Sequence, residues 1–324
     1  MESQVRYNHC ITKQTFMKFL SSITRVLTVV LCTTALFISS CKKEGSATGT
    51  PAEQEEFAMA ASQSDAEAEV IFDDVFDNVM GVDTEVGIGG TGVFAGANLN
   101  SGGGQEVING ANGPDSVTRC FTVAYTQLSP PARFPLKVVI DFGAGCTGRD
   151  GRTRKGKIII VYTGPLFIPG NSTTTTFDGY AVNDISVEGT HKVSNVSTQS
   201  IKAFKVVVLA AKLTKPSGDF TQWNSEKTIS QIEGLGTPLF PLDDVFTLDG
   251  SANGSVKKGD RFFQWGTNIK EPLVKKFICR WIVKGIVVMR KSNTAVAELN
   301  YGNGTCDNKA TLTVNGQVRE ITLH

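Results

Sequence analysis

Along most of this chain, short runs of apolar residues alternate with polar ones, which is the period of β-strands. No helical pattern of ten or more residues interrupts these runs after residue 117, so parallel βαβ units are not expected. The predicted fold is mainly β, an antiparallel meander of about twelve strands that forms either a sandwich or a rolled half-barrel. The strand-like runs span residues 117–125, 136–142, 157–163, 173–187, 202–213, 221–232, 244–248, 261–267, 278–289, 294–300, 310–314 and 317–323.

One helix precedes the strands, and the pattern places it over residues 64–80. Its apolar residues recur at helical spacing and share one face, whereas Asp73, Asp74 and Asp77 fall on the opposite face. Gly81 can end it. We expect the apolar face to pack on the core rather than on a membrane or a cofactor. The residues of this face are Ile71, Phe72, Val75, Phe76, Val79 and Met80.

Glycines mark the expected turns. Residues 81–114 are rich in Gly and Asn and read as a long loop, and Asn315-Gly316 is a strong hairpin signal between the last two strands. Gly189, Gly234 and Gly250 each follow an apolar residue and an acid, which suggests recurring turns or β-bulges.

The N-terminal segment has the composition of a secretory signal. Lys13, Lys18 and Arg25 precede an apolar run from Val26 to Ile38, which is too short to span a bilayer. We therefore predict a signal peptide over residues 1–40. A shorter signal that starts at Met17 would have an ordinary length.

Cys41 closes the sequence Leu36-Phe37-Ile38-Ser39-Ser40-Cys41, which resembles the lipobox of bacterial lipoproteins. The resemblance implies that Cys41 receives lipid and anchors the chain to a membrane. The alternatives are a cleaved signal without lipid and an uncleaved anchor. Residues 41–63 would be the lipidated cysteine and a flexible tether, and residues 64–324 a β-rich domain.

The residue after the cysteine bears on the membrane. Lys42 stands where an Asp often retains lipoproteins in the inner membrane, so an outer-membrane lipoprotein is favoured. In the Bacteroidota an acidic cluster after the cysteine accompanies surface export, and here Lys42-Lys43-Glu44 holds only one acid. Both the periplasmic and the cell-surface face stay open.

Charge argues against one class of partner. Residues 1–40 hold four of the 32 Lys and Arg and one of the 31 Asp and Glu, so the predicted mature chain carries 28 basic and 30 acidic residues, a formal charge of −2. Nucleic-acid binding usually needs a clear basic excess, so no nucleic-acid partner is predicted.

Four cysteines remain once the signal peptide and Cys41 are set aside: Cys120, Cys146, Cys279 and Cys306. In an oxidising compartment an even number favours disulfides, and the near-equal spacing favours 120–146 and 279–306. Sequences before the second cysteine of each pair are alike: each has an Asp or Asn, an aromatic residue and Gly-x-Gly. We therefore predict two similar disulfide-closed hairpin modules, at about residues 117–163 and 277–323. The alternative is four unpaired thiols.

Three motifs resemble ligand-binding loops. Gly87–Gly92 fits G-x-G-x-x-G but lacks the strand before it and the helix after it. Gly151–Lys157 begins like a P-loop, yet Ile158 offers no hydroxyl, and its basic residues form either a solvated turn or an anion-binding tip. Residues 249–260 have the spacing of a calcium loop, but strands flank them. The sequence therefore predicts no metal and no cofactor.

Catalytic signals are weak as well. His191 is the one histidine between Cys41 and the last residue, and no G-x-S-x-G elbow accompanies it. Carboxylates could serve a polysaccharide hydrolase, and Trp residues could stack on sugars. We predict no catalytic residue. Ser116, in Asp115-Ser116-Val117, is a candidate O-glycosylation site. The carboxylates considered are Asp178, Asp184, Asp243 and Asp244, and the aromatic residues are Trp223, Trp265, Trp281, Phe262 and Phe263.

Residues 177–190, 279–285 and 301–308 look like recurring features of uncharacterised cell-envelope lipoproteins of the Bacteroidota. The resemblance covers most of residues 65–324 and implies export and a β-rich domain without a known activity. The expected function is a lipid-anchored, non-enzymatic envelope protein that binds an envelope protein or a glycan or has a structural role. The alternative is a polysaccharide-acting hydrolase.

Overall fold

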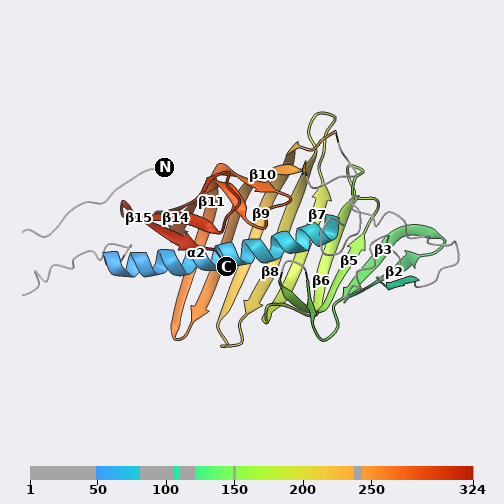
Figure 1. The fold of residues 1–324 in the computed structure, drawn as a ribbon, viewed down its shortest axis with the longest axis horizontal. Coiled ribbons are helices and arrows are strands. Elements are labelled where there is room, and N and C mark those ends of the chain that lie inside the picture. The colour runs from blue at the N-terminus through green and yellow to red at the C-terminus, as the bar shows by residue number, and fades with distance from the viewer. Residues whose placement is uncertain (1–48, 81–105, 110–120, 149–150, 237–242, 324) are drawn as a thin grey trace, which may run out of the picture. The chain divides into compact units, whose positions relative to one another are not determined.

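One antiparallel sheet and one helix make up the part of the chain that the computed structural model describes, which is residues 49–80, 106–109, 121–148, 151–236 and 243–323 (Figure 1). The sheet has 15 strands in these residues, ordered along the chain, and β4 pairs only with β5. The helix α2 (Pro51–Met80) crosses one face of the sheet. The predicted antiparallel meander is confirmed, and because the sheet is continuous it is the rolled form rather than a sandwich. The strands are β1 (Glu106–Asn109), β2 (Thr122–Ser129), β3 (Ala132–Asp141), β4 (Cys146–Thr147), β5 (Thr153–Tyr162), β6 (Ser172–Val182), β7 (Ile185–Asn195), β8 (Ala203–Thr214), β9 (Phe220–Glu233), β10 (Val245–Lys258), β11 (Arg261–Lys276), β12 (Ile282–Lys291), β13 (Thr294–Asn303), β14 (Lys309–Val314) and β15 (Gln317–Thr322).

Three strands exceed the twelve that the sequence predicts. The run over residues 173–187 is two strands, because Asn183 and Asp184 adopt φ of 47° and 65° and form a tight turn between Val182 and Ile185. The apolar residues on both sides of this turn hide it in the pattern. Strand β1 falls within the segment expected to be a loop, and β4 is too short to show a period.

The face of the sheet that carries α2 is the core. In β5, Ile158, Ile160 and Tyr162 are buried, while the residues between them are less buried, as strand alternation requires. The Tyr162 hydroxyl donates a hydrogen bond of 2.7 Å to the carbonyl oxygen of Val79 at the end of α2. The helix is therefore fixed to the inner face of the sheet.

Glycine bulges bend the long strands, as the sequence predicts at two positions. Gly189 has φ of 121° and Gly250 has φ of 144°, and the strand register shifts at both. A Cβ at Gly250 would lie 2.2 Å from the carbonyl oxygen of Glu226 on β9, so only glycine fits there. Bulges increase the local twist and curl a sheet, which here leaves room for the helix.

The helix begins at Pro51, so the prediction of a tether as far as residue 63 is wrong for residues 51–63. Thr50 and Glu53 form a capping box: the backbone N–H of Thr50 donates to Glu53 Oε2 (2.7 Å), and that of Glu53 donates to Thr50 Oγ1 (3.3 Å). Proline is also favoured in the first helical position. The sequence Thr-Pro-Ala-Glu carried this signal, but its composition resembled a linker. No helix in the described residues is long and apolar enough to cross a membrane.

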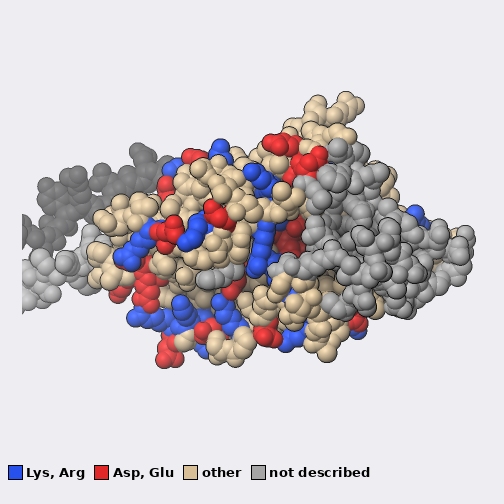
Figure 2. Space-filling model, viewed as in Figure 1, with Lys and Arg blue, Asp and Glu red and all other residues tan. Residues whose placement is uncertain are grey.

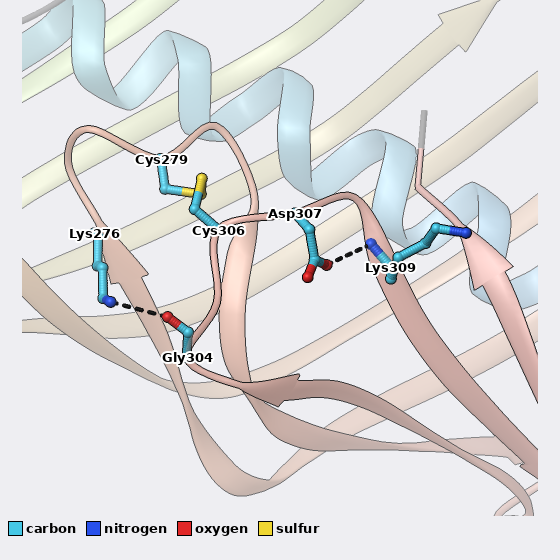
Figure 3. The surroundings of a disulfide bond; sticks show 6 residues. All are labelled: Lys276, Cys279, Gly304, Cys306, Asp307 and Lys309. Carbon is cyan, nitrogen blue, oxygen red and sulfur yellow. Dashed lines mark hydrogen bonds between the residues drawn. A yellow bond between two sulfur atoms is a disulfide. The ribbon is translucent and has the colours of Figure 1, made fainter.

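Connections between strands gather at two opposite ends of the sheet, because each strand reverses direction. We call the end reached after β5, β7, β9, β11 and β13 the first end, and the end reached after β3, β6, β8, β10 and β12 the second end. The Cys279–Cys306 disulfide joins two neighbouring connections of the first end, as Figure 3 shows. In the same place Lys276 Nζ donates to the carbonyl oxygen of Gly304 (2.9 Å).

The two segments predicted to be alike share a local structure. The backbone N–H of Gly143 donates to Asp141 Oδ1, and that of Gly302 donates to Asn300 Oδ1, both at 2.8 Å. The aromatic residue inside each turn, Phe142 or Tyr301, is buried. The first turn lies at the end of β3 and the second in the last residues of β13, so the two lie at opposite ends of the sheet. Cys146 is disulfide-bonded, and Cys120 lies outside the described residues.

Candidate functional site

Asp65, Glu69, Asp73 and Asp77 stand four positions apart on α2, and the first three are buried against the sheet. Asp65 Oδ1 accepts hydrogen bonds from the indole N–H groups of Trp223 (2.9 Å) and Trp265 (3.2 Å). One turn later Glu69 forms a buried ion pair with Lys227, whose ammonium also lies 5.1 Å from the centre of the Trp223 ring. Burial lowers the pKa of Lys227 to about 8, although Asp65 opposes this shift.

Further along the helix, two acids share one lysine. Lys275 Nζ on β11 lies 3.3 Å from Asp73 Oδ2 and 3.4 Å from Asp77 Oδ2. Burial disfavours the charged ammonium, but the two carboxylates together outweigh it and raise the pKa of Lys275 above its ordinary value. The lysine therefore stays charged inside the protein.

Asp74 contacts a third strand, β5, and the residue just before it. Its carboxylate receives Arg154 through Nε (3.1 Å) and Nη2 (2.7 Å), and Arg152 Nη1 lies 3.1 Å away. The Tyr180 hydroxyl lies 3.5 Å from the same carboxylate. A fork of this kind holds a carboxylate in one orientation. Asp73, Asp74 and Asp77 were predicted opposite the core, yet Asp73 and Asp74 are buried, because the curled sheet brings cations to them.

We call these acids, Asp65, Glu69, Asp73, Asp74 and Asp77, the acid stripe of α2. Because each is already bound to a cation or an indole, the stripe supports the docking of the helix rather than acid–base chemistry. The sequence did contain a signal for it, since Asp65, Glu69, Asp73 and Asp77 stand four residues apart.

Beside the stripe lies a cavity of about 300 Å³ between the helix and the second end of the sheet. Its walls come from α2, from the β8–β9 hairpin, from the end of β10 and from β15, and no single stretch of sequence reveals it. Apolar side chains and polar ones both line it, as in many ligand sites. We call it the helix-side pocket. Its main polar residues are Gln63, Glu67, Lys215, Asp219, Lys257 and Lys258.

Some of the charged side chains that line this pocket have partners of their own. Glu67 Oε1 lies 3.0 Å from Lys215 Nζ. Asp219 Oδ1 accepts a hydrogen bond of 2.8 Å from the backbone N–H of Gly259, which lowers the pKa of Asp219. Three lysines therefore face two acids, and the pocket favours an anion.

His191 is not placed for catalysis. It is completely buried, its ring stacks on Phe72 at 6.2 Å, and neither ring nitrogen has a hydrogen-bond partner in the described residues. Burial lowers its pKa to about 3, so the ring is neutral.

The carboxylates considered for a hydrolase do not converge. Asp184 lies in the β6–β7 turn at the second end and pairs with Lys155 (3.3 Å), whereas Asp243 and Asp244 lie at the first end. Asp178, on β6, lies 3.9 Å from Lys157. Burial raises the pKa of Asp244 to about 6, and its carboxylate accepts a hydrogen bond of 2.6 Å from Gln231.

Nor do the aromatic residues form an open platform for sugars. Trp223 and Trp265 are buried with their N–H groups on Asp65, and Trp281 is partly buried beneath Arg280, whose guanidinium carbon lies 4.7 Å from the ring centre. Phe263 packs on Phe57, and Phe262 is exposed near the second end.

The structure also shows what two of the motifs that resemble ligand-binding loops form. In the basic segment, Arg152 and Arg154 turn inward to Asp74, so an anion-binding tip made of the whole segment is not present. The calcium-like spacing falls mostly within the extended strand β10, where consecutive side chains point to opposite faces. No group of three or more His, Cys, Asp or Glu residues in the described ranges could hold a metal ion. Four predicted features lie outside the described residues: Cys41, Cys120, Ser116 and Gly87–Gly92.

Comparisons with known proteins add no relative. Neither a protein-family model, nor a curated protein, nor a solved structure matches this chain.

Proposed function

We propose that this chain is a lipid-anchored, non-enzymatic protein of the cell envelope, held in the outer membrane through Cys41, that binds an acidic glycan or another anionic envelope component in the helix-side pocket. The observation that carries the proposal is the pocket itself, with three lysines against two acids at the mouth of a partly apolar cavity. The disulfides support an exported protein, because such bonds persist in oxidising compartments.

The pocket suits binding better than hydrolysis. A glycosidase needs one carboxyl group with a raised pKa beside a second carboxylate. Here Glu67 is paired with Lys215, and the pKa of Asp219 is lowered rather than raised. A hydrolase stays the alternative proposal: Asp244 has a raised pKa and Asp243 adjoins it, but neither residue lines the helix-side pocket.

Binding is tested with the purified lipid-modified chain and an acidic polysaccharide fraction of the cell envelope, in parallel with a neutral glycan. Replacing both Lys257 and Lys258 with Ala should weaken binding of the acidic fraction about tenfold or more, since two charged contacts are lost. The control is Lys192→Ala, an exposed lysine of β7 outside the pocket. Equal binding by both variants, or equal binding of the neutral glycan, would contradict an anion site in this pocket.

The anchor is tested separately. Cells that express the chain are fed labelled palmitate, and label should enter the protein and disappear in Cys41→Ala. Label that persists in the variant would show that Cys41 is not the site of lipid attachment.

A further inference from the structure

Exposed apolar side chains gather at the first end of the sheet. Phe167 and Ile168 lie in the β5–β6 connection and are 58% and 46% exposed, and Ile201 in the β7–β8 connection is 54% exposed. Ile232 and Leu235, at the end of β9, are 48% and 56% exposed. Side chains of this kind normally lie inside a protein, so a group of them on one end of a sheet indicates a contact surface.

Hydrogen bonds join these connections into one rim. The backbone N–H of Gly170, in the β5–β6 connection, donates to the carbonyl oxygen of Asn195 at the end of β7 (2.9 Å). The N–H of Gln231 on β9 donates to the carbonyl oxygen of Lys202 (2.9 Å), after the β7–β8 connection. We call this row the apolar rim, made of Phe167, Ile168, Val196, Ile201, Ile232 and Leu235.

The rim continues toward the disulfide. Phe277 N–H donates to the carbonyl oxygen of Asp244 (2.9 Å), which joins the β9–β10 and β11–β12 connections. Ile278, beside Cys279, is 68% exposed, and the stacked pair of Arg280 and Trp281 follows it. Tryptophan with an arginine is typical of side chains at the boundary between lipid and water.

The second end has fewer exposed apolar side chains, of which Phe262 and Val318 are the large ones in the described residues. Its hairpins hold Asp184, Lys215, Asp219, Lys258 and Asp260. The β8–β9 and β10–β11 hairpins lie at the lower edge of the sheet in Figure 1, and several blue and red side chains lie along this edge among tan ones in Figure 2. Both ends carry charges, but exposed large apolar side chains are more numerous at the first end, and this difference does not follow from the fold.

We propose that the apolar rim rests in the interfacial layer of the lipid bilayer to which Cys41 is anchored, with the second end pointing away from it. The inference rests on the proposed anchor. Only nine residues, 42–50, separate Cys41 from the start of α2, and they span about 30 Å at most. The domain is thus held beside a bilayer, and apolar side chains on neighbouring loops can enter its surface together.

The charges around the rim favour an apolar contact over an electrostatic one. Lys202, Lys276 and Arg280 stand against Glu233, Asp243 and Asp244 in the same connections, so the balance is even. Binding of the rim should therefore change little with salt, because screening acts on charges and leaves apolar burial in place.

The test measures the depth of a single position. A fluorescent nitrobenzoxadiazole group is attached to Ile201→Cys in the lipid-modified full chain, which is reconstituted into phosphatidylethanolamine–phosphatidylglycerol vesicles. Lipids with a quencher near the headgroup should reduce its emission about twofold or more. The same group on Ser217→Cys, in the β8–β9 hairpin of the second end, should keep its emission. Quenching at both positions or at neither would overturn the proposal.

A second variant tests the row rather than the single position. Phe167→Asp with Ile168→Asp should abolish quenching at position 201, because two charged side chains cannot enter the same layer. Val318→Asp, which changes an equally exposed apolar residue of β15, should leave quenching unchanged. An unaffected signal in the Phe167 and Ile168 variant would show that the rim does not bind as a unit.

Palmitate labelling of each variant separates the two proposals. A chain that carries lipid but shows no quenching at position 201 overturns the apolar rim and leaves the anchor intact. A chain without lipid at Cys41 overturns the anchor, and with it the premise for the rim.

Discussion

The helix α2 presents two stripes to the sheet, and both are largely buried. One is the acid stripe, and the other is an apolar stripe made of Ile71, Phe72, Val75, Phe76, Val79 and Met80. The apolar stripe packs against aromatic residues such as Trp223, which stacks on Phe72 at 5.6 Å. The acid stripe is bound to cations and indoles on β5, β9 and β11. Apolar burial stabilises in any orientation that excludes water, whereas a buried acid needs its partner at one position.

This difference assigns the two stripes separate roles. The apolar stripe supplies most of the free energy that holds the helix on the sheet, since desolvation offsets much of the attraction in buried ion pairs. The acid stripe selects one rotation and one position of the helix, because a shift of a single turn would leave buried charges unpaired.

The largest expected effect comes from removing one charge from the acid stripe. Asp74→Ala leaves Arg152 and Arg154 buried without their carboxylate, and the free energy of unfolding should fall by about 3–5 kcal/mol. Denaturation by urea measures the change.

The control for this variant removes all three charges together. Leu at position 74 with Met at positions 152 and 154 should restore the free energy of unfolding to near the starting value, because no charge is left unpaired. If the single and the triple variant lost the same free energy, the loss in Asp74→Ala would not come from buried charges left without their carboxylate.

For the apolar stripe, the loss in the free energy of unfolding should depend only on the side-chain volume that a substitution removes. Ile71→Ala opens a cavity in the core and should lower the free energy of unfolding by about 3 kcal/mol, whereas Ile71→Val should cost about 1 kcal/mol. The same urea titration checks both. A loss for Ile71→Val as large as that for Ile71→Ala would mean that shape, rather than buried volume, governs this stripe.

Local patterns in the sequence predicted most of this fold, both the strands and the apolar stripe of α2. Each of the twelve predicted runs corresponds to a strand or a hairpin, since strand alternation depends on local residues and the inner face is continuous. The split at Asn183-Asp184 was missed, because polar residues there interrupt the run for only two positions. The apolar stripe of α2 was predicted for the same local reason.

The site was less predictable, because its parts meet only in three dimensions. In the sequence Asp74 resembles a solvated acid. In the fold it is buried, because the curled sheet brings to it Arg154, which lies 80 residues later in the chain. The helix-side pocket likewise joins Glu67 to Lys215 and Ile321. Only the spacing of four between the acids, and the Thr-Pro-Ala-Glu start of α2, were readable in advance.

A buried histidine lets pH distinguish the apolar stripe from the acid stripe. His191 stacks on Phe72, and burial alone lowers its pKa to about 3 from 6.5. Below pH 6.5 the histidine of the unfolded chain binds a proton, whereas that of the folded chain stays neutral until about pH 3. The stability that comes from the neutral histidine is therefore complete above pH 6.5 and declines as pH falls toward 3.

Between pH 6.5 and pH 5 the decline should amount to about 1–2 kcal/mol from this residue. His191→Leu should remove that part of the pH dependence, which is measured as the difference in slope between the two proteins. Parallel slopes would show that the acid stripe, and not His191, controls the response to acid.

The smallest effect is expected at the start of α2, ahead of both stripes. Thr50→Ala removes the side-chain acceptor of the capping box and should lower the free energy of unfolding by about 0.5–1 kcal/mol. Thr50→Ser keeps the hydroxyl and should cost little. Hydrogen exchange of the amides at residues 52–54 should quicken in the Ala variant alone, because the first turn frays while both stripes stay paired. Faster exchange along the whole helix would instead show that the cap holds α2 in place, and the division of roles between the stripes would then be wrong.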